Sequence, residues 1–430
     1  MLYDIAFLLF SIFYIPTLVF RGKLHKDFAE RFGIYGDAKE DALWKARDVI
    51  WIQAVSVGEV ALCKSLIPEL RREYPDRSIV LSTITRTGND LAKRLFSSDA
   101  IVIYFPLDFS GLVKQAIDKI RPKLYVMIET EIWPNVLKEL GRKRVPAILI
   151  NGRISDRSFG KYKAVKRFLA KTLDKVALFC MQSDADAERI KELGAKGDRV
   201  IVTGNMKFDV DIILNNKAAG TTGLFGLDGS DHIFVAGSTH GGEEEIVVSV
   251  YKDLLNEFPD LKLIIAPRHV ERASDVETVV KRFGFDAVKM SRPQDGPSPS
   301  PRGSYPANHQ IYIIDKIGYL NDAYSIAEVV FVGGSLIPHG GQNPIEPAVF
   351  EKPVLFGPYM FNFKAVAASL IENNGALQVR DKKELLMKLS YLLKNRDSRI
   401  SLGLNAKAVI LKSRGASRRN LTAIKELTHD

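Results

Sequence analysis

The densest run of residues suited to binding a charged ligand is FVGGSLIPHGGQNPIEP, at positions 331–347. The run begins inside an apolar stretch at 328–332. A helix is expected after Asn343, with Pro344 as its first residue and Glu346 in its first turn. Glycines allow close backbone approach to a ligand, and free N–H groups at a helix start favour an anion. The run therefore predicts a nucleotide site made by Gly334, Ser335, Gly340, Gly341, Asn343 and Glu346. A glycine-rich turn that binds nothing is the alternative.

A second run offers a carboxylate for proton transfer. The stretch WIQAVSVGE, at 51–59, ends an apolar strand in Ser56, Gly58 and Glu59 before a helix begins. A carboxylate near a helix amino terminus is normally kept ionised. Partial burial would raise the pKa of Glu59 enough for it to accept a proton from a hydroxyl group. A first-turn glutamate that only complements the helix dipole is the alternative.

Arg268 follows another apolar stretch and is suited to a departing phosphate. Its guanidinium is permanently charged, planar and able to make two parallel hydrogen bonds, and a fixed cation stabilises charge that accumulates on a leaving group. The alternative is a surface arginine paired with Glu271. His269 and Arg272 share this motif as supporting residues. Ser238, Thr239 and His240 precede an acidic helix start at 243–245, so they either hold a sugar or phosphate or form a capping box.

Glu129 and Glu131 flank Thr130 at the end of the 124–128 strand. Two carboxylates at this spacing can form an acid–base pair, as in glycosidases. Because Trp133 and Pro134 start a helix, Glu131 is equally suited to cap it, and we interpret the two as sugar-pocket or structural residues. Further candidates at strand ends are Arg153, Asn205 and Lys207. Two Asp-x-Asp pairs occur, at 184–186 and 209–211, but helix capping explains the first, and no metal is expected.

The elements that must position these residues alternate along the chain. Apolar strands are expected at 50–55, 79–83, 101–105, 124–128, 147–150, 178–181 and 200–203, with helices at 60–72, 112–120, 136–142 and 162–173 between them. A second alternation runs from 233 to 378. Such a pattern predicts an α/β fold in which parallel sheets are covered on both faces. Ligands bind beyond the carboxyl ends of such strands, where the polar runs lie.

Length and composition narrow the class of protein. A chain of 430 residues is too long for one core, so two domains are expected. The net charge of +10 suits an anionic partner, but no nucleic-acid-binding module is recognisable, which argues against nucleic acid. The two cysteines, Cys63 and Cys180, lie among apolar residues and are interpreted as core residues of a cytosolic protein.

The amino terminus predicts a membrane anchor. Residues 5–20 carry no charge and are followed by Arg21, Lys23 and Lys26, which places the following domain in the cytoplasm. A spanning helix, an interfacial helix and a buried core helix are all possible for a run of this length. Six basic residues between 161 and 175 form either a solvated face or a surface toward anionic lipid.

Four motifs, in this order, resemble the 3-deoxy-D-manno-octulosonic acid (Kdo) transferase family over essentially the whole chain. They are SVGE at 56–59, ETEIWPN at 129–135, PRHVER at 267–272 and GGQNPIE at 340–346. One departure is Gln53, where the family is expected to carry His. The resemblance implies an inverting glycosyltransferase of the GT-B architecture, in which two doubly wound Rossmann-like domains face a cleft. It also implies CMP-Kdo as donor, a lipid A precursor as acceptor, no metal, Glu59 as general base, and Arg268, Asn343 and Glu346 as ligands of CMP.

On this basis the expected organisation is an anchor at 1–22, an acceptor domain at 23–214, a hinge at 215–230, a donor domain at 231–412 and a final helix at 413–430 that packs back on the first domain. The inner membrane is the expected location, with the catalytic domains in the cytoplasm. Two alternatives remain: a nucleotide-sugar 2-epimerase on the same fold, and a non-catalytic, membrane-bound nucleotide-sugar sensor. The anchor argues against the epimerase, and Glu59 argues against the sensor.

Overall fold

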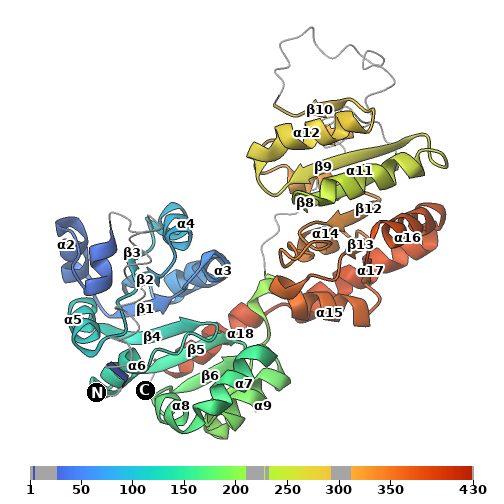
Figure 1. Cartoon of the computed structure of the whole chain (residues 1–430). Helices are drawn as coiled ribbons and strands as arrows, with labels where there is room; N and C mark the ends of the chain where they lie inside the picture. Colours follow the sequence, from blue (N-terminus) through green and yellow to red (C-terminus); the bar gives the residue numbers. More distant parts are fainter. Residues whose placement is uncertain (1–2, 5–26, 210–226, 228–231, 292–310, 429–430) are drawn as a thin grey trace. The chain divides into compact units, whose positions relative to one another are not determined.

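The chain forms two compact units, Met1–Asp211 with Ser413–Asp430, and Ile212–Lys412. The computed structural model describes residues 3–4, 27–209, 227, 232–291 and 311–428. Each unit contains a seven-stranded sheet with helices on both faces (Figure 1). All strand pairs are parallel. The α/β class and the two Rossmann-like domains predicted from the alternating pattern are therefore confirmed.

The sheet of the first unit has the order β3-β2-β1-β4-β5-β6-β7. Its strands are β1 (Val49–Gln53), β2 (Ile79–Thr83), β3 (Ile101–Tyr104), β4 (Pro122–Ile128), β5 (Ala147–Gly152), β6 (Leu178–Met181) and β7 (Val200–Val202). Its helices are α2 (Asp37–Lys45), α3 (Val57–Glu73), α4 (Arg86–Phe96), α5 (Ser110–Ile120), α6 (Pro134–Arg142), α7 (Asp156–Ala164), α8 (Lys166–Leu173), α9 (Asp184–Glu192) and α18 (Ala416–Glu426). The strand order reverses between β1 and β4, which is the point where ligands bind in such sheets.

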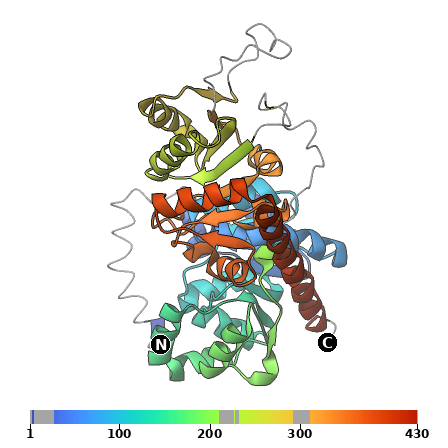
Figure 2. The same cartoon turned by 90° about the vertical axis from the view of Figure 1, so that its right-hand side faces the viewer.

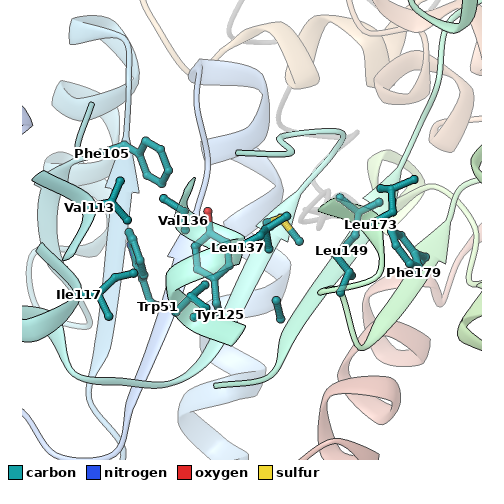
Figure 3. Close-up of a cluster of buried hydrophobic side chains, with 14 of the residues drawn as sticks. Trp51, Phe105, Val113, Ile117, Tyr125, Val136, Leu137, Leu149, Leu173 and Phe179 are labelled. Atoms are coloured by element: carbon teal, nitrogen blue, oxygen red, sulfur yellow. The ribbon is translucent and has the colours of Figure 1, made fainter. Parts of the chain in front are cut away.

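Burial of large side chains on both faces holds β1 and β4 in the centre of this sheet. Every residue of β1 is buried. On one face the rings of Trp51 and Tyr125 lie 4.7 Å apart and pack with Phe105 and with residues of α5 and α6, as Figure 3 shows. On the other face Ile50 and Ile52 pack with α3 and α18. A strand buried on both sides fixes the direction in which its last residues leave the sheet.

The sheet of the second unit has the order β10-β11-β9-β8-β12-β13-β14. Its strands are β8 (His232–Thr239), β9 (Leu261–Pro267), β10 (Ala287–Lys289), β11 (Ile311–Ile313), β12 (Val329–Val332), β13 (Val354–Phe356) and β14 (Ala376–Gln378). The helices are α11 (Glu243–Leu254), α12 (Ala273–Arg282), α13 (Leu320–Ile326), α14 (Ile345–Val349), α15 (Lys364–Glu372), α16 (Lys382–Lys394) and α17 (Arg396–Ser413). Here the order reverses between β8 and β12.

The last helix, α18, belongs to the first unit and packs against α3 (dark red in Figure 2). The hydroxyls of Ser65 and Ser417 lie 2.9 Å apart, and the buried Thr203 hydroxyl donates to the Asn420 side chain at 2.9 Å. The Asp209 carboxylate accepts hydrogen bonds from the N–H groups of Gly415 and Ser417 at the start of α18. These contacts attach the end of the chain to the unit in which it begins.

Two helices differ from the prediction. The helix expected at 162–173 is broken at Val165, where a tight turn joins α7 to α8, and the basic residues between 161 and 175 are divided between these helices and the turn after α8. The helix expected to have Pro344 as its first residue begins one residue later, at Ile345. The Asn343 side chain accepts a hydrogen bond from the Ile345 N–H group at 3.1 Å, as an asparagine just before a helix does.

Of the anchor predicted at 1–22, all but residues 3 and 4 lies outside the described residues, as does all of the predicted hinge at 215–230 except Leu227. Among the helices of the described residues, none is long and apolar enough to cross a membrane.

Candidate active site

Glu59 lies at the switch point of the first sheet, in the first turn of α3. One carboxylate oxygen, Oε2, accepts a hydrogen bond from the Val55 N–H group, and the other, Oε1, accepts a long one of 3.3 Å from the Ser56 hydroxyl. The residue is 8% exposed. Burial raises the pKa of Glu59 to about 8, and the charges of Glu131 and Glu129 add to this effect. Glu59 is therefore a buried carboxyl group with one weakly bonded oxygen and the pKa of a base that works near neutral pH.

Glu131 and Glu129 lie beside Glu59, on the loop that leaves β4. Burial raises the pKa of Glu131 to about 7, although its carboxylate accepts a hydrogen bond of 3.1 Å from the Trp133 indole N–H. The described structure shows no capping bond from Glu131 to α6, whose N-cap residue is Trp133. Oε1 of Glu129 lies 3.9 Å from the Lys207 ammonium group. The structure thus brings three carboxyl groups and a lysine to one edge of the sheet.

The remaining candidates in this unit lie around the carboxyl cluster. Burial lowers the pKa of Lys207. The positive charge of Arg153 lowers it further, while the negative charges of Glu129 and Glu59 act in the opposite direction. The Asn205 side-chain oxygen accepts a hydrogen bond of 2.9 Å from the backbone N–H group of Lys207 and so fixes the backbone at this lysine. Arg153 is held through its backbone, whose N–H group donates to the Thr130 hydroxyl at 3.3 Å. Asn205 is therefore a support, while Lys207 supplies a positive charge near the acidic groups.

Gly58 and Gln53 differ in what surrounds them. A Cβ atom added to Gly58 would meet only the Ser56 hydroxyl, at 4.0 Å, so this glycine leaves open space in front of α3. Gln53, by contrast, is fully buried and accepts a hydrogen bond from the Ser82 hydroxyl. Within the described part of the chain its Nε2 atom has no hydrogen-bond partner. Gln53 thus lies in the interior of the domain.

Three of the seven histidines of the chain gather at the carboxyl end of the second sheet. His240 follows β8, His269 follows β9 and His339 follows β12. The rings of His240 and His339 are stacked at 4.4 Å, and the His269 ring meets His240 edge-on at 6.1 Å. Burial lowers the pKa of His240 to about 4, helped by His339, His269, Arg272 and Arg268. His240 is therefore neutral at pH 7, within a group of residues that favours an anion.

The loop after β12 is held by a carboxylate that the motif analysis did not single out. Glu243, fully buried at the start of α11, accepts hydrogen bonds from the N–H groups of Gly334 (2.6 Å), Ser335 (2.9 Å) and Leu336 (2.9 Å). It also accepts the His240 N–H group at 3.0 Å. The N–H groups of Gly334 and Ser335, expected to face a nucleotide, therefore bind an internal carboxylate. No Ser or Thr side chain caps α11, so the alternative interpretation of Ser238 and Thr239 as a capping box does not hold, and Glu243 instead reaches across to another loop.

The other glycine pair is explained by packing. Gly340 and Gly341 have φ values of +98° and +73°, and a Cβ atom on Gly341 would lie 2.2 Å from the Met360 sulfur. The Ser335 hydroxyl accepts the Gly357 N–H group at 2.8 Å, which ties the same loop to the end of β13. Asn343 donates to the Glu346 carboxylate at 3.1 Å, so these two predicted nucleotide ligands lie side by side.

Arg268 is exposed and makes no ion pair with any described residue, so the alternative pairing with Glu271 is not seen in that part of the chain. Arg272, in contrast, is bound to the buried Glu244 at 2.8 Å and lies 3.9 Å from Asp275. Ser238 has a φ of +56°, and the Thr239 side chain is buried. Of the two arginines, Arg268 is therefore the cation available to a ligand. Within the described ranges no group of three or more His, Cys, Asp or Glu side chains is arranged to hold a metal ion.

Comparison with known proteins identifies the family. A family model described as 3-deoxy-D-manno-octulosonic-acid transferase (kdotransferase) matches residues 26–210. The 3-deoxy-D-manno-octulosonic acid transferase of Haemophilus influenzae is 34% identical over 400 residues, which make up 92% of this chain and 90% of that protein. The chain belongs to the Kdo transferase family. As a member of that family the protein is a glycosyltransferase, and the family predicted from the four motifs is confirmed.

Solved structures agree with the fold. A glycosyltransferase from Rickettsia africae is 14% identical, with a TM-score of 0.59. The match covers 90% of this chain and 100% of that one. A UDP-N-acetylglucosamine 2-epimerase, assigned as putative, from Listeria monocytogenes is 13% identical with the same TM-score of 0.59, covering 89% and 97%. Since transferases and epimerases share this fold, these likenesses establish the two-domain architecture alone.

Proposed function

We propose that this member of the Kdo transferase family transfers Kdo from CMP-Kdo to the glucosamine disaccharide of a lipid A precursor, with inversion, at the cytoplasmic face of the inner membrane. The observation that carries the proposal is Glu59, a buried carboxyl group with a raised pKa at the switch point of the first sheet. The apolar run at 5–20, the basic residues after it and the net charge of +10 support an acceptor embedded in an anionic membrane.

In the proposed reaction Glu59 accepts the proton of the acceptor hydroxyl through Oε1, the oxygen with the longer hydrogen bond. The acceptor oxygen forms a bond to the anomeric carbon of Kdo as the bond from that carbon to the phosphate oxygen breaks. CMP leaves with the electron pair of the broken bond. Displacement of the leaving group from the opposite side inverts the anomeric carbon.

The donor site in this proposal is the carboxyl end of the second sheet. Arg268 supplies the fixed positive charge for the phosphate, with His269 and His240 beside it and Ser238 and Thr239 on the same loop. Asn343 and Glu346 bind the ribose. A monophosphate leaving group carries less charge than a diphosphate, so arginine and backbone dipoles suffice and the proposal includes no metal.

The test is to incubate the purified protein with CMP-Kdo and a tetraacylated lipid A precursor, and to measure product mass and CMP release. Glu59→Gln keeps the shape of the side chain but cannot accept the proton, so turnover should fall by at least about a hundredfold, since a general base contributes ~10²–10⁴-fold. CMP affinity should stay within a few-fold. Glu69→Gln is the matched control, because Glu69 lies on the exposed side of the same helix and, among the described residues, pairs with Arg72. Near-normal turnover of Glu59→Gln would place the base elsewhere, first at Glu131 or Glu129.

A further inference from the structure

Asp4 ties together the starts of two helices that flank the carboxyl cluster. Its Oδ1 atom accepts hydrogen bonds from the Ser110 N–H group at 3.0 Å and from the Asn135 side chain at 2.8 Å. Its Oδ2 atom accepts the Ser110 hydroxyl at 2.7 Å. Ser110 is the first residue of α5 and Asn135 is the second residue of α6. One carboxylate, 106 and 131 positions away in the sequence, therefore joins two helix amino termini, where a negative charge is favourable.

Tyr3 extends the same contact. Its ring is stacked on Phe168 of α8, with centroids 5.8 Å apart and an interplanar angle of 19°. Its hydroxyl is hydrogen bonded to Asp108, a buried carboxylate that accepts the N–H groups of Asn135 (3.2 Å) and Val136 (3.0 Å). We call Tyr3 and Asp4 the amino-terminal latch. Together with Asp108 the latch supplies acceptors for the first N–H groups of both helices, which have no partners within the helix itself.

The latch acts on the loop that carries two of the candidate carboxylates. This loop, 129–133, is fixed at one end by β4 and continues at the other directly into α6. Near its second end the Trp133 ring packs on Phe105 at 5.4 Å, and the Trp133 N–H group holds Glu131. A displacement of the α6 start would therefore move Glu131 and Glu129 relative to Glu59.

We propose that Tyr3 and Asp4 are positioning residues for the transfer reaction. They hold the start of α6 in place and thereby fix the position of the loop that carries Glu131 and Glu129 beside Glu59. The proposal rests on the proposed function for its kinetic consequence, but the contact itself can be tested without any substrate. In the sequence, Asp4 directly precedes the apolar run at 5–20.

The test compares Asp4→Asn with Asp41→Asn in the full-length protein. Asparagine at position 4 removes the negative charge that faces the starts of both helices. Asp41, by contrast, is an exposed residue of α2 that, among the described residues, pairs with Lys45. Amide exchange of Ser110, Asn135 and Val136 should speed up at least about tenfold in Asp4→Asn and stay unchanged in Asp41→Asn. With a detergent-dispersed acceptor, kcat/KM for the acceptor should fall roughly tenfold or more, since small displacements of catalytic groups have large effects on rate. CMP affinity should not change, and Asp4→Glu should restore part of the loss.

A pH profile separates positioning from general destabilisation. If Glu131 moves away from Glu59 in Asp4→Asn, the apparent pKa of the rate should fall, because a neighbouring negative charge is lost. Equal exchange rates and kinetics in Asp4→Asn and Asp41→Asn would overturn the proposal. Faster exchange with unchanged kinetics and pH profile would also overturn the positioning role. If the wild-type protein transfers no Kdo, the proposed function fails, whereas the exchange comparison still decides whether the latch holds α6.

Discussion

Replacing Glu243 by Gln tests whether this buried carboxylate holds the loop after β12. Glu243 accepts four backbone N–H groups, two on each oxygen. An amide can accept on one side only. Whichever way it turns, one buried N–H group, of Gly334 or Ser335, and one partly buried group, of His240 or Leu336, lose their acceptor. At ~1–3 kcal/mol for each buried donor left unsatisfied, Glu243→Gln should destabilise the second unit by about 2–5 kcal/mol.

Thermal unfolding and amide exchange measure this effect. For a unit of this size ~1 kcal/mol corresponds to about 2–4 °C, so the transition of the second unit should fall by roughly 4–20 °C. Exchange of the amides of Gly334, Ser335, Leu336 and His240 should accelerate in the same variant. Glu245→Gln is the matched control, because Glu245 lies in the same first turn of α11 and pairs with Arg282 at 3.0 Å on the surface. That change should cost no more than about 1 kcal/mol.

Equal stability of the Glu243→Gln and Glu245→Gln proteins would refute this reasoning. The two substitutions remove the same charge from the same helix end, so the dipole contribution cancels in the comparison. They differ in the four buried hydrogen bonds of Glu243 and in the surface ion pair of Glu245 with Arg282, which contributes no more than about 1 kcal/mol. A small difference with unchanged exchange at Gly334 and Ser335 would mean that the loop after β12 is held by its other contacts, such as that of Ser335 with Gly357.

The remaining predictions concern the pH dependence of kcat/KM and the stability of two glycine variants. Because burial raises the pKa of Glu59 to about 8 and the base works only when deprotonated, kcat/KM should rise with pH up to about 8 and then level off. Glu131→Gln removes a negative charge near Glu59, so the rise of kcat/KM should move to lower pH. An unchanged pH profile would mean that the Glu131 charge does not raise the pKa of Glu59. Gly341→Ala should lower the melting temperature clearly more than Gly58→Ala, because Gly341 has a positive φ and a Cβ atom 2.2 Å from the Met360 sulfur, whereas Gly58 faces open space. Equal melting temperatures would contradict that packing argument.

Local patterns were sufficient to predict the strands of the first sheet. The bounds expected for β2 and β6 are the observed ones, Ile79–Thr83 and Leu178–Met181, because short apolar runs between polar turns specify buried parallel strands. The gathering of Glu59, Glu129 and Lys207 also followed from sequence, since each residue lies just beyond a strand of one parallel sheet.

What could not be predicted depends on contacts between distant positions. Glu243 lies 91–93 residues from the N–H groups it binds in the loop after β12, and no local pattern reveals such a pair. The stacking of His240 on His339 has the same origin, although three histidines at three strand ends were a usable signal. Helix α14 begins at Ile345, one residue later than the local pattern predicted, and helix ends are the part of an element that such patterns specify least.

The position of α18 has a consequence for synthesis on the ribosome. Domains generally fold in order as the chain emerges, but the first unit here is incomplete until its last helix is made. Leu421, Ala423 and Ile424 fill the same apolar cluster as Ile50 and Ile52, and the buried Thr203 hydroxyl donates its hydrogen bond to Asn420. The nascent first unit therefore exposes one apolar face throughout translation of the whole second unit. Cooperative closure of its core is a post-translational event, and a chain that stops before residue 416 leaves that face open.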